Sequence, residues 1–153
     1  MFDANHDSSP ARRAAWMRIL SLSPWGSLQA VAGGLSGTPH RVLRAPETGL
    51  VMLRGRMGAT GGAFNLGEAT VTRCAVSLAE GVEGHAYVMG RNAAHAHLAA
   101  ICDALLQLPA RYAELADSVI RPLERSLQET HLITSTKVAA TKVDFFTMVR
   151  GDV

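Results

Sequence analysis

The chain has 153 residues, of which 48% are apolar and 18% are charged, and its formal net charge is +2. This composition fits one globular domain with a real core, and the charge is too small to indicate nucleic-acid binding. The first ten residues lack the apolar stretch of a signal peptide, and no apolar run approaches the roughly 20 residues that cross a bilayer. We therefore expect a cytoplasmic protein that binds neither nucleic acid nor membrane.

The two cysteines, Cys74 and Cys102, have no metal-type spacing between them. One falls in a predicted strand and the other on the apolar face of a predicted helix. The pattern indicates two reduced core thiols, as in a cytosolic protein.

The N-terminal part of the chain predicts a loose tail followed by two short helices. Residues 1–8 are polar and read as a disordered tail, and residues 9–153 as a single α+β domain. Ser9-Pro10 and Ser23-Pro24 each have the form of a helix start, with serine as the N-cap and proline in the first turn. Trp16, Ile19 and Leu20 recur at helical spacing, and the second helix ends at Gly33-Gly34. We expect a helical hairpin.

The middle of the chain predicts a sheet. Short runs rich in apolar and β-branched residues cover 40–45, 49–57, 69–78 and 85–90. The turn-like "PETG" separates the first two runs, and "EGVEG" separates the last two. These runs predict a four-stranded antiparallel meander.

The C-terminal part predicts helices. One helix covers residues 91–108, ends at Pro109 and carries the apolar stripe Leu98, Ile101, Cys102, Leu105 and Leu106. A second begins near Ala110, and Pro122 should kink or split it. Its apolar set is Tyr112, Leu115, Val119, Ile120, Leu123 and Leu127. The tail "KVDFFTMVRGDV" fits a strand or a helix, and its β-branched and aromatic residues favour an extended segment.

A glycine-rich stretch, "GATGG" at residues 58–62, is flanked by Arg54, Arg56 and Arg73. It has no Gly-Lys-Ser/Thr and leads into a strand, which excludes the nucleotide P-loop and the dinucleotide fingerprint. Three roles stay open: a plain connection, a protein contact or a phosphate contact. The predicted loop has about eleven residues, longer than a simple hairpin needs, which favours a role beyond turning.

No catalytic constellation is evident from the residues. His95 and His97 point about 200° apart on their helix, so that they cannot share a metal ion. His95 extends the apolar stripe and is expected to be a half-buried, hydrogen-bonded ring. Glu68 is the acid near the glycine loop, and we expect it to accept hydrogen bonds from the arginines. The pattern predicts no catalytic residue and no metal site.

Three blocks of the sequence resemble a known family. "RAPETGLVMLRGRMGATGGAFNLGEATVTRCAV", "GHAYVMGRNAAHAH" and "KVDFFTMVRGD" resemble, in this order, the PhnG family, the G subunit of the bacterial carbon–phosphorus lyase system. The sequence departs from the family pattern at Asn92 and His97.

This resemblance implies a role in organic phosphonate catabolism beside H, I, J and L subunits, with the I subunit as the closest contact. Such a complex transfers the ribose triphosphate of MgATP to methylphosphonate and releases adenine. MgATP would be the substrate of the complex, with no cofactor on this chain, and the chain would not be catalytic alone.

The expected contacts to substrate or partners combine the arginine-flanked loop with the family blocks. They are Arg54, Arg56, Thr60, Gly61, Phe64, Glu68, Arg73, Arg91, His95, Phe145, Phe146 and Arg150. Two alternatives to the complex subunit stay open. One is a stand-alone phosphate- or nucleotide-binding protein that uses the arginine-flanked loop, and the other is a small homo-oligomer with an exposed sheet edge.

Overall fold

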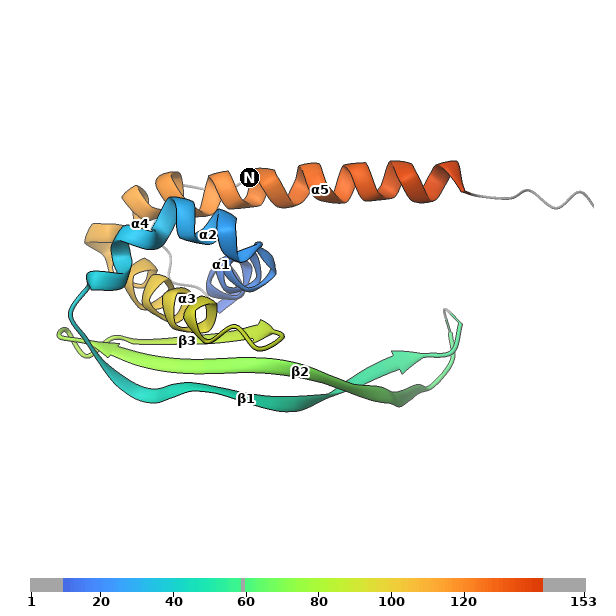
Figure 1. Ribbon diagram of the computed structural model, residues 1–153, viewed down its shortest axis with the longest axis horizontal. Helices are drawn as coiled ribbons and strands as arrows, with labels where there is room; N and C mark the ends of the chain where they lie inside the picture. Colours follow the sequence, from blue (N-terminus) through green and yellow to red (C-terminus); the bar gives the residue numbers. More distant parts are fainter. Residues whose placement is uncertain (1–9, 59, 142–153) are drawn as a thin grey trace, which may run out of the picture.

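The computed structural model describes residues 10–58 and 60–141 (Figure 1). The predicted tail at 1–8 and the ambiguous segment 142–153 lie outside these residues. In chain order the elements are α1 (Pro10–Leu22), α2 (Trp25–Ala32), the 3-10 helix η1 (Gly33–Gly37), β1 (His40–Arg56), β2 (Ala63–Leu78), β3 (Glu83–Met89), α3 (Ala93–Leu106), α4 (Pro109–Leu115), the π-helix η2 (Ala116–Ile120) and α5 (Arg121–Ala140). The α+β class is confirmed, with helices on both sides of the strands in sequence.

The described residues form one antiparallel sheet of three strands, in the order β1-β2-β3, so the predicted fourth strand is wrong. Segment 40–45 and residues 49–56 of the second segment belong to one strand, β1, which continues through the turn-like residues 46–49. The register of β1 against β2 shifts between Val42 and Arg44 and again between Arg44 and Glu47. Because β1 is an edge strand with an irregular register here, it accommodates Pro46, whose missing N–H would break the ladder of a central strand.

The helices cover one face of the sheet, and the core lies between the two layers (Figure 1). Helix α3 packs on β2 and β3, and α1 lies beside both α3 and β3. The approach of α3 to β3 is so close at Gly84 that a Cβ there would overlap the backbone of α3 at Ala100 and Ala104. The predicted apolar stripes of α1 and α3 are both buried in this core.

One carboxylate ties three elements of the core together. Asp103 of α3 is fully buried and accepts hydrogen bonds from Arg13 Nη2 (2.7 Å) and Arg13 Nε (3.2 Å) and from Trp16 Nε1 (2.8 Å), all on α1. It also accepts one from the backbone N–H of His85 on β3, at 2.9 Å. A buried charge needs such partners, and here they fix α1 and β3 against α3.

The C-terminal helices follow the prediction of a long apolar helix interrupted near Pro122. Helix α4 passes through the π-helical turn η2 into α5, and Pro122 is the second residue of α5. A π-turn loosens the regular hydrogen-bond ladder, which gives a place for a residue without an N–H. Among residues 10–58 and 60–141, no helix has the length and apolar character needed to cross a membrane.

Candidate partner-binding surface

The β1–β2 hairpin is much longer than the rest of the sheet. Strand β2 pairs with β3 only from Val71 to Ser77, whereas it pairs with β1 from Leu78 out to Ala63. Residues 50–58 and 60–70 therefore form a two-stranded ribbon, which we call the distal arm. Figure 1 shows the arm extending past β3 and α3 to one end of the molecule. A two-stranded ribbon that pairs with no third strand and packs against no helix is only marginally stable in water.

The distal arm exposes large apolar side chains. Met57 is 79% exposed and Leu66 is 65% exposed. The other exposed apolar side chains of the arm are Leu50, Met52, Leu53 and Phe64. Such a concentration on one projecting element is typical of a surface that another protein covers.

The two faces of the arm differ in character near its tip. Phe64 lies directly opposite Gly55, and both the Phe64 ring and the Leu66 side chain lie in van der Waals range of the position that a Cβ on Gly55 would occupy. On the alternate face, Arg54 lies opposite Asn65, and Arg56 lies opposite Ala63. One face is thus apolar and the other carries two arginines.

The glycine-rich loop turns the chain at the tip of the arm. It joins Arg56, where β1 ends, to Ala63, where β2 begins, so it is shorter than the eleven residues predicted. A Cβ at Gly61 would overlap the carbonyl oxygen of Met57, so only glycine fits this turn. The Arg56 Nη1 donates a hydrogen bond to the Gly61 carbonyl at 3.3 Å, which braces the turn. A guanidinium that closes a turn in this way has fewer N–H groups free for an anion.

The outer half of α5 is a second projecting surface. All residues from 128 to 140 are exposed, and Leu123 alone is buried within this helix. Leu132 is 68% exposed and Val138 is 64% exposed, and Ile133 lies between them in an exposed position. Figure 1 shows this half of α5 extending past the core toward the same end as the distal arm.

The structure separates the predicted contact residues into distinct places. Arg54, Arg56, Thr60, Gly61, Phe64 and Glu68 come together on the distal arm. Arg73 lies in the three-stranded part of the sheet, opposite Tyr87, and Arg91 lies exposed between β3 and α3. His95 lies in the core, and Phe145, Phe146 and Arg150 lie outside the described residues.

The acid that binds arginines is Glu47, not Glu68 as predicted. Glu47 Oε1 accepts a hydrogen bond from Arg73 Nε at 2.6 Å and another from Arg44 Nη1 at 2.7 Å. The hydrogen bond from Arg73, followed by that from Arg44, lowers the pKa of the Glu47 carboxyl. Within the described residues, Glu68 accepts no hydrogen bond from an arginine and lies opposite Met52 on the arm. The ion pairs of Glu47 with Arg44 and Arg73 are exposed to solvent, so they contribute little to stability.

The predicted hydrogen bond of the His95 ring is confirmed, but the ring is buried and not half-buried as predicted. The ring is buried, and its Nε2 lies 2.8 Å from the carbonyl oxygen of Leu20. The backbone N–H of His95 also donates to the side chain of Asn92, which is the N-cap of α3. Both interactions are structural, and they leave His95 no access to a ligand at the surface.

A second histidine contact was not predicted. His40 at the start of β1 and His97 on α3 face each other, with their Nε2 atoms 2.8 Å apart. Desolvation by burial, with a smaller contribution from the charge of His40, lowers the pKa of His97. The two residues are 57 positions apart, and no local signal in the sequence connects them.

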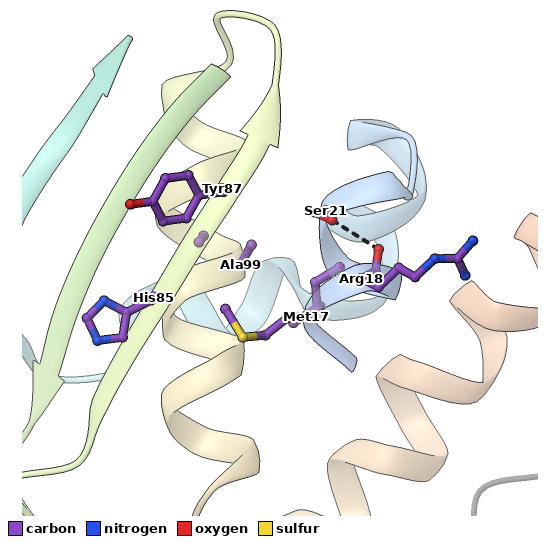
Figure 2. A pocket seen from close by; sticks show the side chains of 8 residues that line it. Met17, Arg18, Ser21, His85, Tyr87 and Ala99 are labelled. Carbon is purple, nitrogen blue, oxygen red and sulfur yellow. Dashed lines mark hydrogen bonds between the residues drawn. The ribbon is translucent and has the colours of Figure 1, made fainter. Parts of the chain in front are cut away.

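The hollow between α1, α3 and β3 is lined mostly by apolar side chains and backbone, without the convergent polar groups of an active site. Figure 2 shows the hollow of about 160 Å³ between α1, α3 and β3. Met17 points into it, whereas His85 and Tyr87 lie on the opposite side of β3 and Arg18 points away. The hydrogen bond shown in Figure 2 runs from Ser21 Oγ to the Arg18 carbonyl, and both residues belong to α1.

The described residues also contain no activated nucleophile and no complete metal centre. Cys102 is buried, and desolvation raises the pKa of its thiol to about 12. Burial raises the pKa of Cys74 as well. No group of three or more histidine, cysteine, aspartate or glutamate side chains in residues 10–58 and 60–141 is placed to hold a metal ion.

Comparison with known proteins shows the family to which the chain belongs. The model of the family described as phosphonate metabolism protein PhnG matches residues 11–151. The alpha-D-ribose 1-methylphosphonate 5-triphosphate synthase subunit PhnG of Rhizobium meliloti (strain 1021) is 41% identical over 156 residues, which cover 99% of each chain. The chain belongs to the PhnG family of phosphonate metabolism proteins, which confirms the resemblance seen in its sequence blocks.

Proposed function

We propose that this chain is a docking subunit, not catalytic alone, of a ribose 1-methylphosphonate 5-triphosphate synthase. In that reaction an oxygen of methylphosphonate attacks the anomeric carbon of the MgATP ribose. The C–O bond forms, the C–N bond to adenine breaks, and adenine leaves. MgATP is the substrate of the assembled complex, and this chain contributes binding surfaces to the assembly.

The distal arm carries this proposal. Its two strands extend beyond the third strand of the sheet and beyond the helix layer. They nevertheless carry exposed apolar side chains, such as Met57, Phe64 and Leu66. A projecting apolar ribbon is stabilised when a partner covers it, because burial removes that surface from water. The exposed outer half of α5 projects toward the same end and offers a second contact to the same partner (Figure 1).

The partners proposed for these surfaces are the H, I, J and L subunits of the carbon–phosphorus lyase system, with the I subunit in closest contact. The segment 142–153, with Phe145 and Phe146, follows directly after the exposed half of α5. Its two aromatic side chains are of the type that anchors interfaces. The proposed location of the assembly is the cytoplasm.

The alternative of a stand-alone nucleotide-binding protein is not supported. Arg73 is engaged with Glu47 in the sheet, far along β2 from the arm tip, and His95 is in the core. The arginines of the arm therefore do not converge with either residue on one phosphate. Membership of the PhnG family agrees with the subunit role.

Co-purification tests the docking role. The chain is expressed with its partner subunits, one partner carries an affinity tag, and the amount of this chain that is recovered is measured. We expect the double substitution Phe64→Ser and Leu66→Ser to reduce recovery at least tenfold. The matched control is Leu22→Ser, an exposed apolar position on α1 away from the arm, which should leave recovery unchanged.

The same preparations test catalysis by following adenine release from MgATP with methylphosphonate present. The assembled complex should release adenine, and the single chain should release none above the uncatalysed rate. Adenine release by the single chain would contradict the docking role, and so would full recovery of the double variant with its partners.

A further inference from the structure

The contact between His40 and His97 joins two elements that are distant in sequence. His40 begins β1, and His97 lies in the second turn of α3. Their Nε2 atoms are 2.8 Å apart, and their ring centroids are 4.8 Å apart at an angle of 60°. Both rings are half-buried. This contact plays no part in the proposed docking surface.

The surroundings of His40 determine its tautomer. Its Nδ1 lies 2.6 Å from the carbonyl oxygen of Thr38. A carbonyl oxygen only accepts, so Nδ1 carries the proton, and the Nε2 of neutral His40 has a free lone pair directed at His97. A backbone carbonyl that holds the far nitrogen of an imidazole is the usual support of a metal-ligating histidine.

We propose that His40 and His97 form a two-nitrogen binding site for a divalent transition-metal ion, with Zn²⁺ as the reference ion. His97 donates from Nε2 to His40 in the ion-free state, and it presents Nε2 as a ligand once its proton moves to Nδ1. Two nitrogens bound to one tetrahedral Zn²⁺ lie about 3.3 Å apart, with Zn–N distances of about 2.0–2.1 Å. The observed 2.8 Å therefore needs to widen by only about 0.5 Å.

Each of the two histidines also borders a hollow of the surface. His40 lines a hollow of about 450 Å³ with Pro39, Arg41 and Ser77, and His97 lines another of about 150 Å³. We propose water molecules from these hollows as the remaining ligands of the ion. Neither hollow has a carboxylate in its lining, so the site selects ions that prefer imidazole nitrogen over Mg²⁺ and Ca²⁺, which prefer oxygen.

Calorimetric titration of the tag-free full chain with ZnCl₂, after removal of bound metal with a chelator, tests the site. We expect one Zn²⁺ per chain. His40→Gln and His97→Gln should each weaken binding at least tenfold, because each removes one of two ligands. His131→Gln, at an exposed position of α5, is the matched control and should change the affinity less than twofold. MgCl₂ should give no binding heat.

Nitrogen NMR of the histidine rings in the unmodified chain gives a second measurement that does not depend on how the variants fold. Zn²⁺ should shift the Nε2 signals of His40 and His97 and leave the Nδ1 proton of His40 in place. The proposal is overturned if the chain takes up no Zn²⁺, or if His97→Gln binds it as tightly as the unmodified chain. It is also overturned if Zn²⁺ shifts the His85 or His131 ring instead.

Discussion

Replacement of Asp103 should be among the most destabilising single changes in the described core. Asp103→Ala removes the acceptor of Arg13, Trp16 and the His85 backbone N–H, at distances of 2.7 to 3.2 Å. Each buried donor left without a partner costs about 1–3 kcal/mol. The Arg13 side chain is 33% exposed and regains some water, so its share is smaller. We expect a loss of about 3–5 kcal/mol, as for other broken buried ion pairs.

Urea unfolding followed by tryptophan fluorescence measures this loss, because Trp16 is buried beside Asp103. Asp103→Asn keeps the shape and one acceptor oxygen, and it should cost about 2–3 kcal/mol. Asp117→Asn is the matched control, because Asp117 forms an exposed ion pair with Arg121, and its effect should stay below about 0.5 kcal/mol. A loss below about 1 kcal/mol for Asp103→Ala, with an unchanged denaturant slope, would refute the argument that this carboxylate holds α1 and β3 on α3.

Three further changes test other parts of the structure. Gly84→Ala should lower the midpoint of thermal unfolding sharply, because the added Cβ would overlap the α3 backbone. Gly49→Ala is the control, because a Cβ at Gly49 meets open space. Equal midpoints for the two variants would contradict the close packing of β3 on α3. The free energy of unfolding should fall as the pH rises above about 9, because the Cys102 thiol ionises there when unfolded but keeps its proton until about pH 12 when folded. Cys102→Ala should flatten this decline in urea titrations, and an unaltered slope would contradict the burial argument. Phe145→Ala or Phe146→Ala should reduce the amount of chain that co-purifies with partner subunits and should leave the helix content, measured by circular dichroism, nearly unchanged. Normal assembly of a variant that unfolds early would instead place the aromatic pair in the core.

The helices and most of the core follow directly from the sequence because their signal is local. Apolar residues at helical spacing, as in Trp16, Ile19 and Leu20, leave α1 one face that can be buried. Pro10 and Pro109 begin α1 and α4, because proline suits the first turn of a helix. Ser23 does not cap α2 as predicted: Pro24 is the N-cap, and the Ser23 Oγ donates to the Ile19 carbonyl of α1. The burial of His95 was also predictable, because it extends the apolar stripe of α3.

The number of strands was not predictable from local pattern. The residues 46–49, "PETG", have the composition of a turn, yet pairing with β2 holds them in an extended strand. Glu47 contributes by bridging Arg44 and Arg73, a contact that exists only once β1 and β2 are paired. Long-range pairing of this kind overrides a local turn preference.

Contacts between distant elements were equally hidden in the sequence. In the sequence, Asp103 is only a polar residue beside the apolar stripe of a helix. Its hydrogen-bond donors come from α1 and β3 and are apparent only in the fold. In the sequence, His40 is only the first residue of a strand, and its contact with His97 of α3 is apparent only in the fold. In both cases the chemistry of one residue depends on a partner more than 50 positions away, and periodicity carries no information about such pairs.

The energy that the distal arm can contribute to assembly is comparable with that of folding itself. Covering a large apolar side chain such as Leu66 or Met57 contributes about 1.5–3 kcal/mol, so the exposed apolar set of the arm contributes on the order of 10 kcal/mol. Association costs about 4–15 kcal/mol in lost freedom, and the total stability of a domain is about 5–15 kcal/mol. The arm alone therefore roughly balances the cost of binding, and a tight complex needs a second surface. The outer half of α5, exposed from residue 128 to 140 and directed toward the same end, is placed to supply it.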